Sequence, residues 1–282
     1  MSPAATAVRA GWTRGLIELR QSFANGAELV SHFLWPVLTL AVAWWLSDVP
    51  FGDSGYPLGT LILPSVLGMN VANGMIAMSQ QLTAEREDGT LLRAKAVPHG
   101  MLGYLTGKIV SVAGGTVADL AIFLIPGMLI ISGLVVGDLD SWLTLAWVVA
   151  LGLVATLPAG AVLGSVFGSA RAQGLITLPF LGLIAISGIF YPISSLPGWL
   201  QGVAQVFPFY WLGLGTRSAL LPDSAAALEI GGSWRHLETA GVLGVWAVLG
   251  LALAPVVLRR MARRESGSSV AERRERALRR IG

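Results

Sequence analysis

The chain has 282 residues, of which 54% are hydrophobic and only 12% carry a charge. A soluble domain carries about twice that charged fraction, so the composition excludes an ordinary soluble protein and indicates a polytopic membrane protein. The absence of cysteine excludes disulfides and thiolate metal sites, and the net charge of +3 matters less than where the charges lie.

Residues 1–28 are predicted to precede the first membrane span as a cytoplasmic N-terminus. Four apolar side chains recur there at helical spacing: Trp12, Leu16, Leu19 and Phe23. This pattern predicts an amphipathic helix lying in the membrane interface. Gly11, Gly15 and Gly26 lower the helix propensity and favour the alternative, a weakly ordered tail. We expect no cleavable signal peptide, because no basic segment leads into a short apolar core.

Six apolar stretches predict six transmembrane helices, which together form a membrane domain over residues 29–258. A helix needs about 20 residues to cross a hydrocarbon core about 30 Å thick. The predicted spans are 29–46, 57–79, 109–131, 142–163, 174–190 and 239–258. The expected fold class is therefore an all-α polytopic membrane protein.

A densely charged segment, residues 81–98, separates the second and third spans. Its charged residues are Glu85, Arg86, Glu87, Asp88, Arg93 and Lys95. So many charges are costly in lipid, and the segment must project into water. Gly89 suits a tight turn, and we expect Pro98 to open the next helix, because proline is tolerated in a first turn. The alternative is a solvated loop whose charges reflect topology alone.

Residues 191–221, just before the last span, are broken by prolines into pieces too short to cross a bilayer. We expect two re-entrant half-helices here. Both would enter the membrane from one side, where protein or water must cover the exposed backbone.

The distribution of basic residues sets the topology. Six spans place both termini on one side, and every lysine and arginine except Arg217 and Arg235 falls on that side. The positive-inside rule assigns that side to the cytoplasm, together with residues 81–98, and places residues 191–221 outside. We expect the basic cytoplasmic tail, residues 259–282, to bind anionic lipid headgroups or, alternatively, to extend as a helix towards a partner protein.

The sequence contains no convincing catalytic or metal-binding constellation. Its three histidines are scattered, and no Gly-x-x-x-x-Gly-Lys-Ser/Thr loop is present to bind nucleotide phosphates. Asp119, inside the third span, is a candidate for a substrate path, because an ionisable residue there is functional by default. Asn70 and Asn73 of the second span are weaker candidates. The alternative for all three is hydrogen bonding between helices, with Lys108 about three turns from Asp119 and thus distant for a direct bond.

Two motifs carry a resemblance to a known family. The run from Arg86 to Arg93, with Pro98 behind it, resembles the cytoplasmic signature of ABC-2-type exporter permeases. The outer segment is similar too, with Tyr191-Pro192, then Leu196 to Leu200, Pro208 and Arg217. The resemblance covers the six-span body, and daunorubicin-type and multidrug-resistance permeases are closest in size and pattern.

The resemblance implies a non-catalytic membrane subunit of an ATP-driven exporter in the bacterial plasma membrane. Two such subunits, alike or different, would pair and dock two ABC ATPase subunits, which would hold the ATP and magnesium. The coupling segment would contain Glu85, Arg86, Glu87, Asp88, Gly89, Thr90, Leu91 and Leu92, with Leu91 and Leu92 anchored in an apolar pocket of the ATPase. The N-terminal helix would be the connecting helix. The outer gate would include Pro192, Pro197, Trp199, Pro208 and Arg217.

Two other function classes stay open from the residues alone. One is a proton-coupled secondary transporter that uses Asp119, and the other is an intramembrane enzyme acting on lipid-linked substrates. The abundance of Leu, Ile, Val, Phe and Trp favours a hydrophobic or amphipathic substrate such as a drug, antibiotic or lipid. The expected partners are membrane lipids and the two kinds of subunit, and we expect no nucleic acid.

Overall fold

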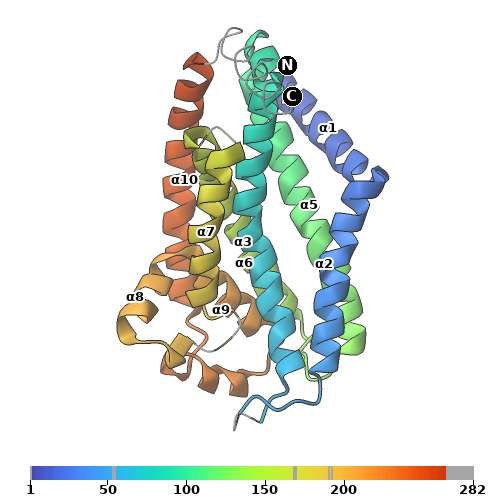
Figure 1. Ribbon diagram of the computed structural model, residues 1–282, viewed down its shortest axis with the longest axis vertical. Helices are drawn as coiled ribbons and strands as arrows, with labels where there is room; N and C mark the ends of the chain where they lie inside the picture. The colour runs from blue at the N-terminus through green and yellow to red at the C-terminus, as the bar shows by residue number, and fades with distance from the viewer. Residues whose placement is uncertain (1, 53–54, 168–169, 190, 192, 265–282) are drawn as a thin grey trace.

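The computed structural model describes residues 2–52, 55–167, 170–189, 191 and 193–264. Within this part of the chain the secondary structure is helical, without strands, as Figure 1 shows. The α-helices are α1 (Pro3–Ala24), α2 (Gly26–Trp45), α3 (Leu58–Glu87), α4 (Thr90–Lys95), α5 (Gly100–Ile130), α6 (Leu139–Val166), α7 (Ala170–Ile186), α8 (Gly198–Val206), α9 (Pro208–Leu220) and α10 (His236–Arg264). Short 3-10 helices lie at Ile193–Ser195, Asp223–Leu228 and Ile230–Gly232.

Five of the described helices, α2, α3, α5, α6 and α10, are long and apolar enough to cross a membrane. They coincide with five of the six predicted spans. The remaining predicted span falls on α7, a shorter apolar helix of 17 residues, about 25 Å long at 1.5 Å per residue. The predicted all-α polytopic membrane fold is confirmed.

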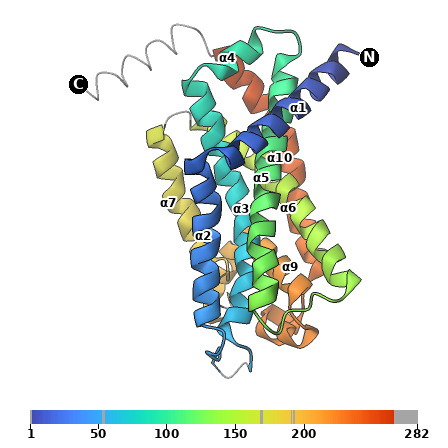
Figure 2. The ribbon, with the colours of Figure 1, turned by 90° about the vertical axis from the view of Figure 1, so that its right-hand side faces the viewer.

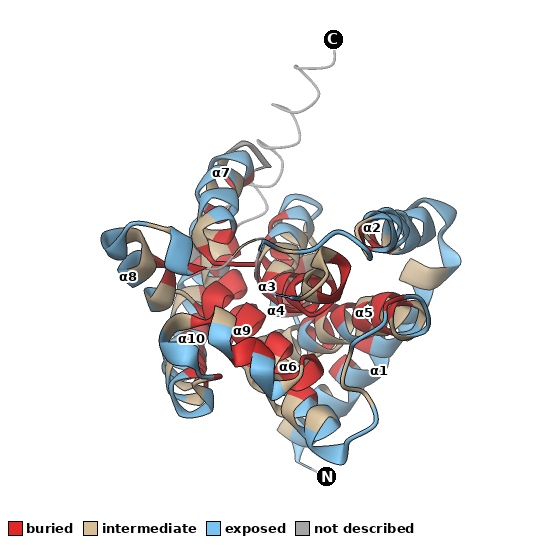
Figure 3. Cartoon of the chain, turned by 90° about the horizontal axis from the view of Figure 1, so that it is seen from below, coloured by how far each residue is buried: buried red, intermediate tan, exposed pale blue. Residues whose placement is uncertain are grey.

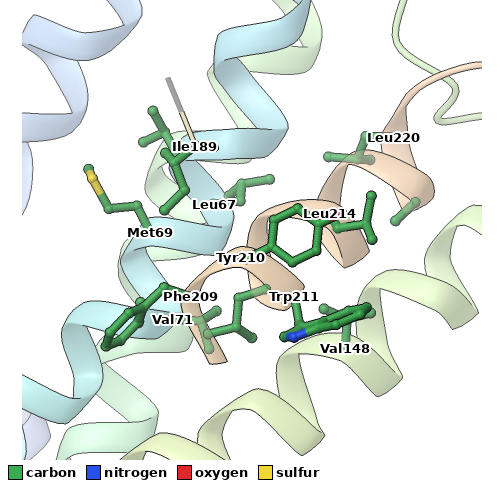
Figure 4. Close-up of a cluster of buried hydrophobic side chains, with 14 of the residues drawn as sticks. Leu67, Met69, Val71, Val148, Ile189, Phe209, Tyr210, Trp211, Leu214 and Leu220 are labelled. Carbon is green, nitrogen blue, oxygen red and sulfur yellow. The ribbon is translucent and has the colours of Figure 1, made fainter. Parts of the chain in front are cut away.

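The centre of the bundle is formed by α3 and α9. Within the apolar 18-residue stretch of α3 that could span a membrane, 67% is buried. The corresponding value for the peripheral helix α2 is 17%. Figure 3 shows the contrast between the buried α3 and α9 and the exposed α2, α7 and α8. In Figure 4 the aromatic side chains of α9 lie among apolar residues of α3 and α6. Residues 63–69 of α3 are buried without interruption, so every side of the helix faces protein there, as in a core helix.

Helices α8 and α9, of 9 and 13 residues, are too short to cross a core about 30 Å thick. The prediction of two short helices in residues 191–221 therefore agrees with the structure. Nearly all of α9 is buried, so protein covers its backbone as a half-helix requires. The re-entrant path from the outer face stays a prediction, and Pro192 lies outside the described residues.

The helices divide the molecule into two ends. Helices α1 and α4 and the C-terminal end of α10 lie together at one end, which is at the top of Figures 1 and 2. Helices α8 and α9 and the α5–α6 connection lie towards the other. The described chain termini, at Ser2 and Arg264, therefore share an end with the charged segment. Residues 265–282 of the predicted basic tail lie outside the described residues.

Helix α1 packs against α5 through glycines on both helices. A Cβ atom on Gly11 would lie 2.1 Å from the carbonyl oxygen of Gly103, and one on Gly15 would lie 2.4 Å from that of Gly107. Such close approach requires glycine on the facing surfaces. Interpreting Gly11 and Gly15 as signs of a weakly ordered tail was therefore wrong. The helix formed by the N-terminal segment presents Trp12 and Leu16 away from this contact, 55% and 46% exposed.

The glycine contact generates a test of how α1 is held. We expect Gly11→Ala to loosen α1 from α5, because the new methyl group meets backbone that cannot move aside, at about 1–3 kcal/mol for overpacking. Hydrogen exchange of residues 3–24 in nanodiscs should rise clearly. Gly26→Ala is the matched control, since a Cβ atom on Gly26 would have no neighbouring atom within 4 Å. Unchanged exchange in Gly11→Ala would contradict the contact.

Candidate functional site

The charged segment folds into a tight turn between two helices. Helix α3 ends at Glu87, Gly89 adopts a left-handed conformation with φ of 81°, and α4 begins at Thr90. The Asp88 carboxylate accepts a hydrogen bond of 2.8 Å from the Thr90 backbone N–H. Glycine reaches positive φ without the steric cost that other residues meet, so Gly89 sets the direction in which α4 leaves α3. Helix α5 begins at Gly100 rather than at Pro98, which lies in the preceding turn.

The turn is anchored to its own bundle by Leu91. Its side chain is 1% exposed and belongs to a buried cluster with Leu82, Leu258 and Met261. This corrects the expectation that Leu91 inserts into a pocket of another chain. Leu92 is only half-buried. The residues of the turn that face outward include Glu87, Asp88 and Arg93. Their proposed contact with an ATPase stays a prediction.

An ion cluster centred on the buried Lys108 lies next to the turn. The Lys108 ammonium of α5 donates to Glu18 of α1 at 3.0 Å and to Glu85 of α3 at 2.7 Å. The Arg14 guanidinium of α1 donates to Glu18 at 2.7 Å and lies 3.9 Å from Glu85. The Lys108 side chain is only 5% exposed. Three helices therefore meet at one ammonium group.

The cluster changes the role expected for Glu85. Its carboxylate points into the bundle at Lys108 instead of outward, and its second oxygen is buried without a hydrogen-bond partner. Burial would raise the pKa of Glu18, but Arg14 and Lys108 together lower it below its usual value. The stability that Glu18 contributes is therefore present at neutral pH and is lost only as the pH falls through that lowered pKa.

Asp119 has a partner that sequence reasoning missed. Its carboxylate lies 2.5 Å from Nδ1 of His32 on α2, and the His32 ring stacks on Phe23 with centroids 4.4 Å apart. The Asp119 side chain is 32% exposed and lines a cavity between α1, α2, α3 and α5. Pairing with a neighbouring helix agrees with the alternative considered for Asp119, although Lys108 is not the partner. Asn70 and Asn73 are half-buried on α3 and do not line this cavity.

The predicted gate residues are spread over the opposite end. Pro197 precedes α8, Pro208 is the first residue of α9, and Trp199 is 71% exposed. Arg217 is different, because its guanidinium is buried. It donates to Glu229 at 2.6 Å, to the Gly188 carbonyl at 3.1 Å and to Ser65 at 3.2 Å.

Arg217 therefore ties α9 to α3, to the chain after α7 and to the connection before α10. The sequence offered one signal for this pair, the isolated Glu229 in an otherwise weakly charged stretch. No described contact brings Arg217 and Trp199 together.

The ion cluster generates a stability prediction. We expect Lys108→Met to leave Glu85 with only Arg14 at 3.9 Å, while Glu18 keeps its bond to Arg14. The free energy of unfolding should fall by up to about 3–5 kcal/mol, as it does when a buried ion pair is broken. Adding Glu85→Gln should recover part of the loss. Unfolding in mixed micelles measures both. Lys95→Met removes an exposed lysine that lies outside the cluster, and its effect should stay within about 0–1 kcal/mol, the contribution of an exposed ion pair. Equal stabilities for the Lys108 and Lys95 variants would contradict the cluster's role.

The pair at the other end makes a second prediction. Glu229→Gln removes the charge facing Arg217, whose side chain is 7% exposed, and leaves a buried guanidinium uncompensated. We expect a loss of about 3 kcal/mol or more in unfolding free energy. Glu238→Gln is the matched control, because the Glu238 side chain is 51% exposed in its ion pair with Arg235, and we expect a much smaller loss. A loss no larger than the control's would show that the buried pair is not structural.

Comparison with known proteins identifies the family to which the chain belongs. No curated protein matches the sequence. Residues 53–255, well over half of the chain, match the family described as ABC-2 family transporter protein. The match runs from just before α3 to the last turns of α10 and so contains the charged turn, Lys108, Asp119 and Arg217. The chain is therefore a member of the ABC-2 transporter family, a membrane permease component of an ABC transporter.

Proposed function

We propose that this chain is the permease subunit of an ATP-driven exporter that moves a hydrophobic or amphipathic compound out across the bacterial plasma membrane. Members of the family are non-catalytic membrane subunits, and the family implies ABC ATPase partners. In this proposal two ATPase subunits bind ATP and magnesium and dock on a pair of permease chains, alike or different. Both termini and the charged turn face the cytoplasm.

The observation that carries the proposal is how the charged turn is built. Its outward surface is charged and includes Glu87, Asp88 and Arg93, while Leu91 is buried beneath it. A partner pressing on this surface would push against a turn that is fixed to the bundle. A solvated loop with no partner needs neither the buried anchor nor the ion cluster behind it.

The geometry supplies a path for force to travel inward. Glu85 lies two residues before the end of α3, and Lys108 joins it to α5 and, through Glu18, to α1. Displacement of the turn would therefore move three helices together. Helix α3 also runs to the other end of the bundle, where Ser65 contacts Arg217. In the proposal this is how a push at the cytoplasmic end reaches the outer gate.

The proposal is tested by reversing the charges on the outward surface. We expect Glu87→Lys with Arg93→Glu to lower substrate-stimulated ATPase activity of the reconstituted complex at least tenfold, because complementary charges at an interface no longer match. Leu91, Gly89 and the ion cluster are untouched, so the turn keeps its buried anchor, although Arg93 loses its hydrogen bond to Thr90. The control, Asp138→Lys with Asp140→Lys, makes two charge changes at the opposite end, before and within the first turn of α6.

Two results would count against the proposal. Normal stimulated turnover in the Glu87 and Arg93 variant would remove the turn from the coupling pathway. Transport that persists without any ATPase and collapses with the proton gradient would replace the exporter by the proton-coupled alternative.

A further inference from the structure

A polar cavity of about 720 Å³ opens between four helices, and Glu28 and Gln80 of its lining are exposed. Its walls come from α1, α2, α3 and α5, and Figure 2 shows α2 beside α3 and α5 beneath α1. The cavity extends along α5 from Lys108 to Asp119, which is about 16 Å of helix. Its volume lies within the range of small-molecule sites, about 300–1,000 Å³.

The charges that line this cavity are mostly negative. Four carboxylates face it: Glu18, Glu28, Glu85 and Asp119. The cationic groups in the lining are Lys108 and, when protonated, His32. Lys108 is already held by two of the carboxylates, and Arg14, outside the lining, pairs with Glu18. Among the described contacts, the carboxylates at the Asp119 end pair with neutral or titratable groups, Asp119 with His32 and Glu28 with Asn25.

An apolar groove of about 480 Å³ continues along the same two helices. All its lining side chains are apolar, among them Phe33, Val37 and Trp44 of α2. On α5 the residues Asp119, Ile122, Pro126 and Ile130 follow one another at spacings of three and four. Residues at these spacings share one face of a helix. The seam between α2 and α5 is therefore acidic at Asp119 and apolar beyond it.

We propose that this seam binds a cationic amphiphile, with its ammonium group at the Asp119 carboxylate and its apolar chain in the groove towards Ile130. The inference rests on the proposed export function and names the class of compound exported. A carboxylate within a membrane span is energetically costly and by default indicates a functional site. A ligand cation at Asp119 would supply the opposite charge. A zwitterionic lipid fits less well, because its phosphate would meet the carboxylates while Lys108 is already occupied.

The test measures binding to the permease alone and needs no ATPase. Tritiated decyltrimethylammonium is titrated against the purified full chain in phosphatidylcholine nanodiscs, and decanol serves as the uncharged probe. We expect saturable binding of the ammonium compound and at least tenfold weaker binding to Asp119→Asn, with decanol unaffected. Asparagine can keep the hydrogen bond to His32, so the seam should retain its shape. The bilayer supplies choline headgroups in excess, so binding seen there reports recognition of net positive charge.

Two further variants complete the test. Asp140→Asn, at the opposite end of the bundle, should bind both probes as the unmodified chain does. Ala41→Trp, which fills the apolar groove, should weaken both probes. Undiminished ammonium binding to Asp119→Asn, or an equal loss of decanol, would overturn the assignment. Because no ATPase is present, that failure would leave the coupling proposal standing, while failure of the charge-reversal experiment would leave the binding result intact.

Discussion

The half of this structure that holds both described chain termini depends on the ammonium of Lys108. This side chain of α5 is almost fully buried, and its ammonium group pairs with one carboxylate from α1 and one from α3. An unpaired ammonium in that position would be strongly disfavoured, so the three helices are held in one arrangement. The charged turn follows directly after Glu85 of this cluster, and the buried side chain of Leu91 holds the turn against the bundle. The proposed coupling role requires a turn that is rigid relative to the helices it moves, and these two contacts favour that rigidity.

The opposite end of the bundle is also held together by a buried cation, here Arg217. Arg217 is buried beside Glu229 and takes two further acceptors, from α3 and from the chain after α7. Buried charges are retained only when paired and hydrogen-bonded. Each end of the bundle is thus organised around one cation that joins segments far apart in the sequence, and α3 contributes a residue to both. The central stretch of α3 between Ser65 and Ser79, which carries no charged residue, connects them.

Much of the fold could be predicted because hydropathy and charge acted together. Long apolar runs located five of the membrane helices, and the proline pattern located the two short helices of residues 191–221. Contacts between helices could not be predicted in the same way. The partners of Lys108 lie 90 and 23 residues away, and periodicity reports only which residues share a face. Gly11 and Gly15 were misread because low helix propensity and close helix packing call for the same residue. Leu91 was misassigned because a leucine in a charged turn can pack against its own bundle or against a partner protein. The sequence does not show on which side the side chain lies.

The family match begins at residue 53, after α1 and α2, yet both helices contribute to the sites described above. Glu18 supplies one of the two carboxylates on Lys108, and His32 is the partner of Asp119. Neither site is complete within the matched segment. The set of helices that forms these contacts is therefore larger than the matched segment, and a chimera that exchanged residues 53–255 between related permeases would separate each of these pairs. A transferable module would have to carry the first two helices with it.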